Sequence, residues 1–163
     1  MNADRATAAD YLRIGVELGL VEPQRARDWA EAVIRTEPAP DAEIIEVSWS
    51  QDMAALIRSL HTVPGEGNRV LAGQWLLADL GEALGRCDDD HLEQVVRQCL
   101  AVCVAAGLDE DTYRSFDAID DALSLARQGT YGSVGACREG LVNLLAAYPG
   151  APWAGIDAHP ARG

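Results

Sequence analysis

The residues of this chain that are best suited to chemistry stand together in one short segment, Cys87-Asp88-Asp89-Asp90-His91. Thiolate, carboxylate and imidazole groups all bind metals, but a metal site needs side chains that converge on one point, usually with ligands from a second element. Adjacent residues at the start of a helix point in different directions, and acidic residues are stabilised there by the helix dipole. The segment therefore predicts an acidic helix cap, and no metal or other cofactor is expected.

Other candidate catalytic groups lack the arrangement that a reaction needs. His61 and His159 stand alone beside loops and prolines. Ser133, in Gly132-Ser133-Val134-Gly135, follows no strand, whereas a nucleophile elbow and a phosphate-binding loop both require one. Cysteines form no C-x-x-C pair, and Cys99 and Cys103 fall in an apolar helical stripe, so reduced structural thiols are expected at all four cysteines, which include Cys87 and Cys137. No catalytic residue is predicted.

Acidic side chains gather in three stretches with few basic residues, and two of these stretches predict a binding surface. Asp117, Asp120 and Asp121 lie beyond the first turn of their helix, where like charges four residues apart cost about 0.2–0.5 kcal/mol per pair. Glu43 and Glu46 belong to a stretch, residues 37–52, that contains no basic residue. A solvated face is the alternative explanation for both stretches.

Two tryptophans raise a related question. Trp49 follows Glu46 by three residues, and an aromatic side chain beside acidic residues can form an interface hot spot. Tryptophan is more often a core residue, and burial is the alternative for both Trp49 and Trp75. The predicted contact residues for a partner are accordingly Asp117, Asp120 and Asp121, followed by Glu43, Glu46 and Trp49.

A helical apolar rhythm predicts the elements that carry these groups. Apolar residues at offsets of 0, 3, 4, 7, 8 and 11 form one continuous stripe, made by Leu92, Val95, Val96, Cys99, Leu100 and Cys103. Similar stripes recur along the chain between glycine and proline breaks. They predict an all-α fold, a single domain of seven to eight helices in an irregular antiparallel bundle or array over residues 1–148. Residues 149–163 are expected to form an extended tail, pinned to the body by Trp153 and Ile156.

Helix ends are predicted from capping residues. Pro23 suits the first turn of one helix, whereas Ser50, Asn68, Asp109 and Ser133 are expected N-caps. The last helix is expected to reach Tyr148, before Pro149-Gly150. Residues 41–49 fit both a strand and a helix, and we predict a short helix because the chain offers no second strand to pair with.

Composition and charge limit the function classes. The chain has 163 residues, 48% of them hydrophobic, and a formal net charge of −13 with every basic residue an arginine. Such a charge repels nucleic acid and anionic membranes and favours a basic protein partner, although solubility alone is a competing explanation. The N-terminus resembles no signal peptide and no apolar run is long enough to span a bilayer, so a cytoplasmic location is expected.

One segment resembles a recurring pattern in small helical bacterial proteins, many of them uncharacterised and some found with secreted toxin systems as immunity proteins. The segment is Pro38-Ala39-Pro40-Asp41-Ala42-Glu43-Ile44-Ile45-Glu46-Val47-Ser48-Trp49-Ser50, after a helix that contains Trp29. The pattern is a helix, a proline break and a hydrophobic-Glu-hydrophobic-Ser stretch, and the likeness covers residues 20–60. It implies no catalytic residues.

These observations lead to one functional hypothesis and two alternatives. The hypothesis is a non-enzymatic acidic module that binds a basic protein, most concretely an immunity-type inhibitor of a basic bacterial toxin. The first alternative is a ligand- or metal-binding enzyme with a pocket between helices, for which Cys87, His91 and the flanking acids are the available chemistry. The second alternative is a self-associating structural protein.

Overall fold

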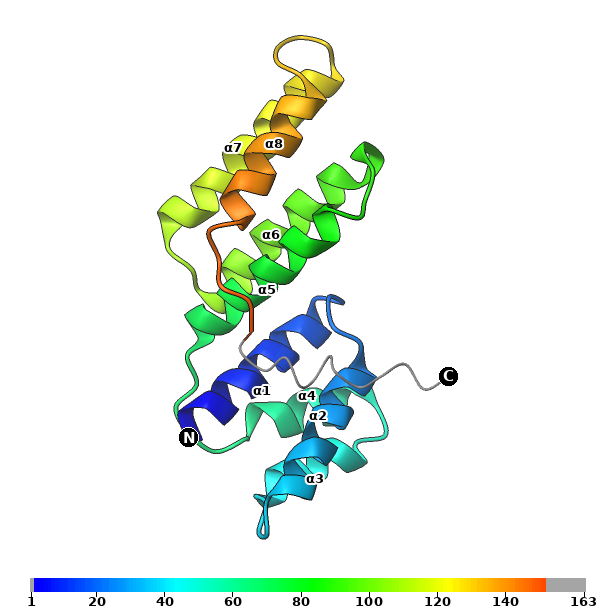
Figure 1. Ribbon diagram of the computed structural model, residues 1–163, viewed down its shortest axis with the longest axis vertical. Helices are drawn as coiled ribbons and strands as arrows, with labels where there is room; N and C mark the ends of the chain where they lie inside the picture. The colour runs from blue at the N-terminus through cyan, green and yellow to red at the C-terminus, as the bar shows by residue number, and fades with distance from the viewer. Residues whose placement is uncertain (1, 152–163) are drawn as a thin grey trace. The chain divides into compact units, whose positions relative to one another are not determined.

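The computed structural model describes residues 2–151, with side chains from residue 5 onward, and every regular element in this range is helical (Figure 1). The all-α prediction is confirmed, and residues 42–49 form a helix rather than a strand. The α-helices are α1 (Asn2–Glu17), α2 (Pro23–Thr36), α3 (Ala42–Trp49), α4 (Met53–His61), α5 (Arg69–Leu84), α6 (Leu92–Ala106), α7 (Glu110–Arg127) and α8 (Val134–Leu145), with a 3-10 turn η1 (Asp89–His91) before α6.

The helices divide into two compact units, Met1–Ala72 and Gly73–Gly150, so the boundary falls inside α5. The first unit contains α1 to α4 and the first turn of α5, and the second contains the rest of α5 and α6 to α8. A single body of residues 1–148 with a tail of residues 149–163 stays a prediction. The expected packing of Trp153 and Ile156 lies outside the described residues.

In the first unit each helix packs against two others. Helix α1 contacts α2 and α4, and α3 also contacts α2 and α4 (Figure 1). The apolar stripes that the sequence predicts meet between these helices. All four helices contribute fully buried side chains, and the largest, from α1, α3 and α4, are Tyr11, Leu12, Ile14, Ile44, Leu56 and Leu60. The short helix α3 is therefore held on its inner face, while its other face is left for solvent.

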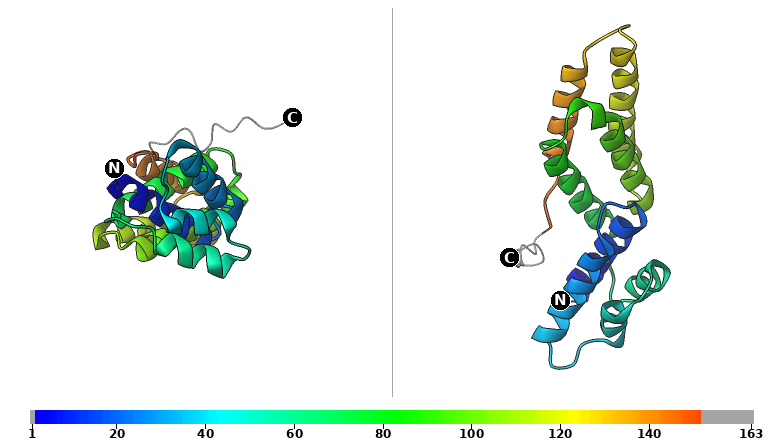
Figure 2. Two further views of the ribbon diagram at one scale, coloured as in Figure 1. Left: turned by 90° about the horizontal axis from the view of Figure 1, so that it is seen from below. Right: turned by 90° about the vertical axis from the view of Figure 1, so that its right-hand side faces the viewer.

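In the second unit the helices alternate in direction. Helix α7 packs against α6 on one side and α8 on the other, and Figure 2 shows α7 and α8 running side by side. Helix α5 approaches α6 closely at Gly73, where a Cβ atom would lie 2.4 Å from the Cβ of Ala106. It approaches α8 at Gly81, where a Cβ would lie 3.2 Å from Leu145. Gly73 and Gly81 thus allow α6 and α8 to pack closely against α5.

Most helix ends lie where the capping residues predict. Side chains of Asp109 and Ser133 accept hydrogen bonds from backbone N–H groups in the first turns of α7 and α8. The predicted cap at Ser50 is wrong, because its hydroxyl donates back to the Val47 carbonyl at 2.8 Å and Asp52 caps α4 instead.

The end of α8 also differs from the prediction. The helix stops at Leu145 rather than reaching Tyr148, and the Tyr148 ring stacks on Phe116 of α7 with the ring centroids 6.5 Å apart. Tyr148 is half-buried because its ring packs on α7, and Pro149 directly after it cannot continue a helix.

Gly107 ends α6 in the left-handed region with φ of +67°, and its N–H bonds back to the helix. We expect Gly107→Ala to lower the free energy of unfolding by about 1 kcal/mol, because a Cβ is strained at this φ although the space around it is open. Gly85→Ala is the control, since Gly85 also follows a helix but lacks a positive φ. Equal urea midpoints for the two variants would contradict the prediction.

Candidate binding surface at the α3–α4 corner

The Cys87–His91 segment closes one end of the second unit and is held there by two arginines. Arg138 of α8 donates to the carbonyl oxygens of Leu84 and Cys87, both at 2.7 Å, and to the Asp89 carboxylate at 3.1 Å. These contacts hold the segment at the start of α6, where neither Asp88 nor His91 makes a side-chain cap hydrogen bond, so the predicted acidic cap stays a prediction. Among residues 2–151 no three His, Cys, Asp or Glu side chains gather as a metal site needs.

Arg127 of α7 provides the second attachment. It donates to the Glu93 carboxylate at 2.7 Å and to the Asp89 carbonyl oxygen. The hydrogen bond from Arg127 holds the pKa of Glu93 below its ordinary value. Because the folded-state pKa is the lower one, the pair stabilises the fold above the ordinary glutamate pKa, and this contribution is lost as the pH falls through the folded-state value.

Arg138→Met is expected to lower the free energy of unfolding by about 1.5 kcal/mol, because two helix-end carbonyl oxygens lose a charged donor. The matched control is Arg114→Met, which removes an exposed ion pair with Glu110 on one helix and should change stability by less than about 0.5 kcal/mol. Chemical denaturation measures both. If the free energy of unfolding falls equally in the two variants, the hydrogen bonds to Leu84 and Cys87 do not stabilise the fold.

The four cysteines are free thiols. Burial raises the pKa of Cys103 to about 11, and it raises the pKa of the more deeply buried Cys99 further. Cys87 is partly exposed, whereas Cys137 is buried. We expect a thiol-specific disulfide reagent to modify Cys87 first in the native protein and Cys99 last, as mass spectrometry of the labelled peptides can determine. Equal rates at Cys87 and Cys99 would contradict the burial described here.

The predicted contact residues fall in both units. Asp117, Asp120 and Asp121 lie on α7 in the second unit, whereas Glu43, Glu46 and Trp49 lie on α3 in the first. In the described part of the chain, no basic side chain lies within 4.0 Å of any of these five carboxylates. The predicted contact residues thus belong to two sets, one in each unit.

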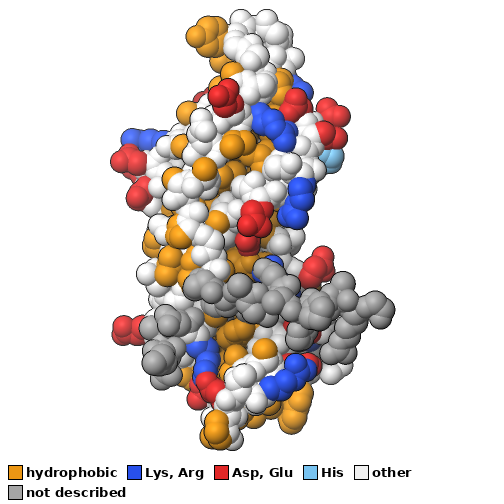
Figure 3. Space-filling model, viewed as in Figure 1, with side chains coloured by type: hydrophobic (Ala, Val, Ile, Leu, Met, Phe, Trp, Pro, Cys, Tyr) orange, Lys and Arg blue, Asp and Glu red, His pale blue; other side chains and the backbone are white. Residues whose placement is uncertain are grey.

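On α7 the surroundings of the acidic set are mixed in charge. Asp121 is exposed, while Asp117 and Asp120 are half-buried. Asp120 lines a shallow depression of about 260 Å³ between α6 and α7, and the same depression contains Arg97 and Arg127. On the face that Figure 3 displays, acidic side chains likewise lie scattered among arginines and apolar groups. Helix α7 also carries two partly exposed apolar side chains, Tyr113 at 36% and Leu125 at 40%, each four residues from an acid of the set.

On α3 the arrangement is different, because an aromatic side chain projects into solvent. Trp49 is 73% exposed, whereas Trp75 is 4% exposed and belongs to the core. Glu46, one helical turn before Trp49, is also exposed, and Glu43 is half-buried. The expectation of burial is therefore correct for Trp75 and wrong for Trp49.

Trp49 stands at a tight junction between α3 and α4. Its backbone carbonyl accepts a hydrogen bond from the Gln51 side chain at 3.1 Å, and the Ser50 carbonyl accepts one from Arg27 of α2 at 3.0 Å. The Asp52 carboxylate then accepts from the Ala55 N–H at 2.8 Å and starts α4. Because every residue of this turn is hydrogen-bonded, Trp49 is presented on a defined scaffold rather than on a long loop.

A depression of about 410 Å³ adjoins Trp49 at this junction. We name the junction the Trp49 corner, and the residues that define it are Glu46, Trp49, Gln51, Asp52, Ala55 and Arg58. Met53, which follows Asp52 in the sequence, is 51% exposed. Sequence reasoning missed Arg58 and Met53 as surface residues, since both fall in a helical segment whose other residues supply the core.

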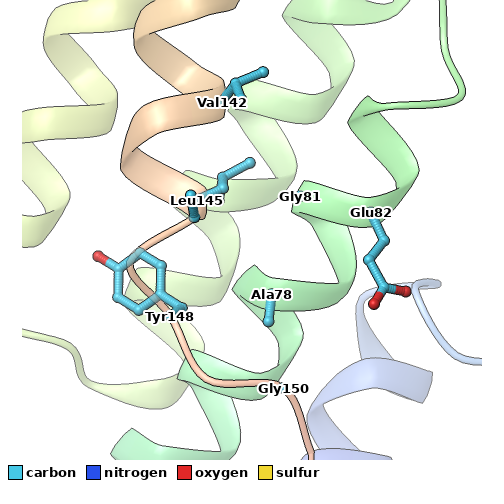
Figure 4. Close-up of a pocket in the computed structure, with 8 residues that line it drawn as sticks. Ala78, Gly81, Glu82, Val142, Leu145, Tyr148 and Gly150 are labelled. Atoms are coloured by element: carbon cyan, nitrogen blue, oxygen red, sulfur yellow. The ribbon is translucent and has the colours of Figure 1, made fainter.

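A second depression, of about 310 Å³, lies between α5 and α8 in the second unit. Figure 4 shows the side chains of Val142 and Leu145 extending from α8 toward α5, with Glu82 on α5. Among the residues that line it, Glu82 is the one charged side chain, and burial raises the pKa of Tyr148. The lining is otherwise apolar or small, so it brings together no acid–base pair.

Neither a known protein family, nor a curated protein, nor a solved structure matches this chain. In the described range, none of the helices is both long and apolar enough to cross a membrane. The Trp49 corner combines an exposed aromatic side chain, a depression and two carboxylates, those of Glu46 and Asp52.

Proposed function

We propose that this protein is a non-enzymatic binding module that holds a basic protein partner through the Trp49 corner. The observation that carries the proposal is the exposure of Trp49 beside unpaired carboxylates on a hydrogen-bonded turn. Leaving most of a tryptophan in water forgoes on the order of 3 kcal/mol of burial energy. Tryptophan is also enriched among the residues that dominate binding energy in interfaces.

The overall charge supports a cationic partner. At −13 the chain attracts a basic protein at long range, which raises the association rate and makes it depend strongly on salt. In this proposal Asp117, Asp120 and Asp121 contribute to the attracting field, while the Trp49 corner makes the close contact. A basic toxin domain, neutralised in the cytoplasm by an immunity-type inhibitor, is the most concrete partner of this kind.

Comparative capture tests the proposal. The wild-type protein, Trp49→Ala and Tyr131→Ala are immobilised separately and exposed to an extract of the source organism. Tyr131 is the matched control because it is 78% exposed but lies in the second unit, away from α3 and α4 in the sequence. We expect a basic protein to be retained by the wild type and Tyr131→Ala, to be released by raised salt, and to be lost from Trp49→Ala. Retention of the same proteins by Trp49→Ala would refute the proposal.

A further inference from the structure

We propose that the Trp49 corner receives an arginine side chain of the partner, with the guanidinium group stacked on the Trp49 indole and paired with the Glu46 carboxylate. This inference rests on the proposed function and names the chemistry of the contact. It uses the exposed ring, the charges around it and the end of α3, each of which lies within the first unit.

The C-terminal end of α3 favours a positive charge. Helix dipoles place partial negative charge at their C-termini, where lysine or arginine side chains usually compensate it. The last turn of α3 contains no basic residue and includes Trp49 itself. Arg27 of α2 already brings one guanidinium group to this helix end, since its Nε donates to the Ser50 carbonyl oxygen at 3.0 Å. A partner cation would therefore be attracted mainly by the exposed ring and the Glu46 carboxylate.

Side-chain charges near the ring add to the helix end. Glu46 and Asp52 line the depression together with Arg58, and Glu43 lies one turn before Glu46 on α3. With Arg27 on the Ser50 carbonyl, three carboxylates stand against two guanidinium groups. In the described residues neither Glu43 nor Glu46 forms an ion pair, so both remain available to a partner. The Asp52 carboxylate uses Oδ1 to cap α4, which leaves Oδ2 as a further acceptor. The local balance is negative around an apolar surface.

Arginine matches this combination better than lysine. The guanidinium group is planar and weakly hydrated, so it stacks on an aromatic face while its edge donates to a carboxylate. Lysine is a compact and strongly hydrated charge that pairs with carboxylates but gains less from stacking. Glu46 lies three residues before Trp49 on α3, which places the two side chains on the same side of the helix.

A second copy of the chain is the less favoured occupant. Each copy carries a net charge of −13, so bringing two copies together adds repulsion at every exposed carboxylate of the corner. Charge complementarity instead selects a partner of opposite sign. Measurement of the solution mass belongs to the test, because a dimer that dissociates in Trp49→Ala would assign the corner to self-association and overturn the inference.

The test compares two peptides, Gly-Ser-Arg repeated three times and Gly-Ser-Lys repeated three times, which carry the same charge. Each is titrated into the full-length protein while the tryptophan indole N–H signals are followed by NMR, with the Trp49 signal assigned from Trp49→Phe. We expect the Trp49 signal to move on titration with the arginine peptide and the apparent affinity to be about fivefold higher than for the lysine peptide. An unmoved Trp49 signal, or equal affinities, would overturn the inference.

Charge variants complete the test. Glu46→Gln is expected to weaken binding of the arginine peptide by about threefold, whereas Asp111→Asn, which removes one exposed charge from α7, should change its affinity by less than about 1.5-fold. Equal losses in the two variants would also overturn the inference. Loss of the arginine preference alone leaves the proposed function standing if extract capture still depends on Trp49. If Trp49→Ala captures the same proteins as the wild type, the proposed function itself is wrong.

Discussion

Trp49→Ala is expected to weaken binding of the captured partner by about thirtyfold or more while leaving the free energy of unfolding within about 0.5 kcal/mol of the wild type. The reason for this separation is the position of the side chain. Trp49 is 73% exposed at the last turn of α3, so its removal opens no cavity in the fold. Calorimetric titration measures the affinity, and chemical denaturation measures the stability.

Val47→Ala provides the opposite control on the same helix. Val47 is fully buried, so its truncation should cost about 2 kcal/mol of stability while the folded fraction keeps its affinity. The two variants together separate a binding residue from a core residue of α3. A large loss of stability in Trp49→Ala, with affinity unchanged, would show that Trp49 is a packing residue and that the corner is not a binding surface.

Gly73→Ala is expected to lower the free energy of unfolding by about 2 kcal/mol, the largest stability effect among the glycines of the second unit. The added Cβ would lie 2.4 Å from the Cβ of Ala106, and an alanine side chain has no rotamer by which to move away. The backbones of α5 and α6 must therefore separate, and the cost of this overpacking exceeds the gain in helix propensity.

Gly135→Ala is the matched control for this substitution. Gly135 also lies in a helix, near the start of α8, but nothing stands within 4 Å of the position that its Cβ would take. The same chemical change should be neutral or slightly stabilising there. If Gly73→Ala proved as stable as Gly135→Ala in thermal or urea unfolding, the close approach of α5 to α6 at this point would be contradicted.

The helices were predictable because their ends depend on local chemistry. Pro23, Asp109 and Ser133 start helices as their types predict, and Gly107 ends one in a left-handed conformation that suits glycine. The exchange of Ser50 for Asp52 was not predictable in this way. Both residue types make good caps, and the conformation of Ser50 involves a contact from Arg27, which lies 23 residues earlier in the chain.

The candidate site was predictable only in part, because exposure depends on how helices pack. Trp49 and Trp75 both fall in apolar helical patterns, and the sequence does not show which one lacks a neighbouring helix. The same limit applies to Arg127 and Arg138, whose partners in the Cys87–His91 segment lie 38 to 51 residues earlier. Their contacts follow from the packing of the second unit rather than from any local motif.

Photocrosslinking from position 49 determines whether Trp49 touches the partner. A photoreactive aromatic amino acid is introduced at position 49 and, separately, at position 131, where the native tyrosine is equally exposed. After irradiation in the source organism, crosslinked species are isolated and identified by mass spectrometry. We predict a single dominant crosslink to a basic protein from position 49 and none to that protein from position 131. The same crosslinks from both positions, or none from position 49 to any basic protein, would show that Trp49 is not a contact residue for a basic partner.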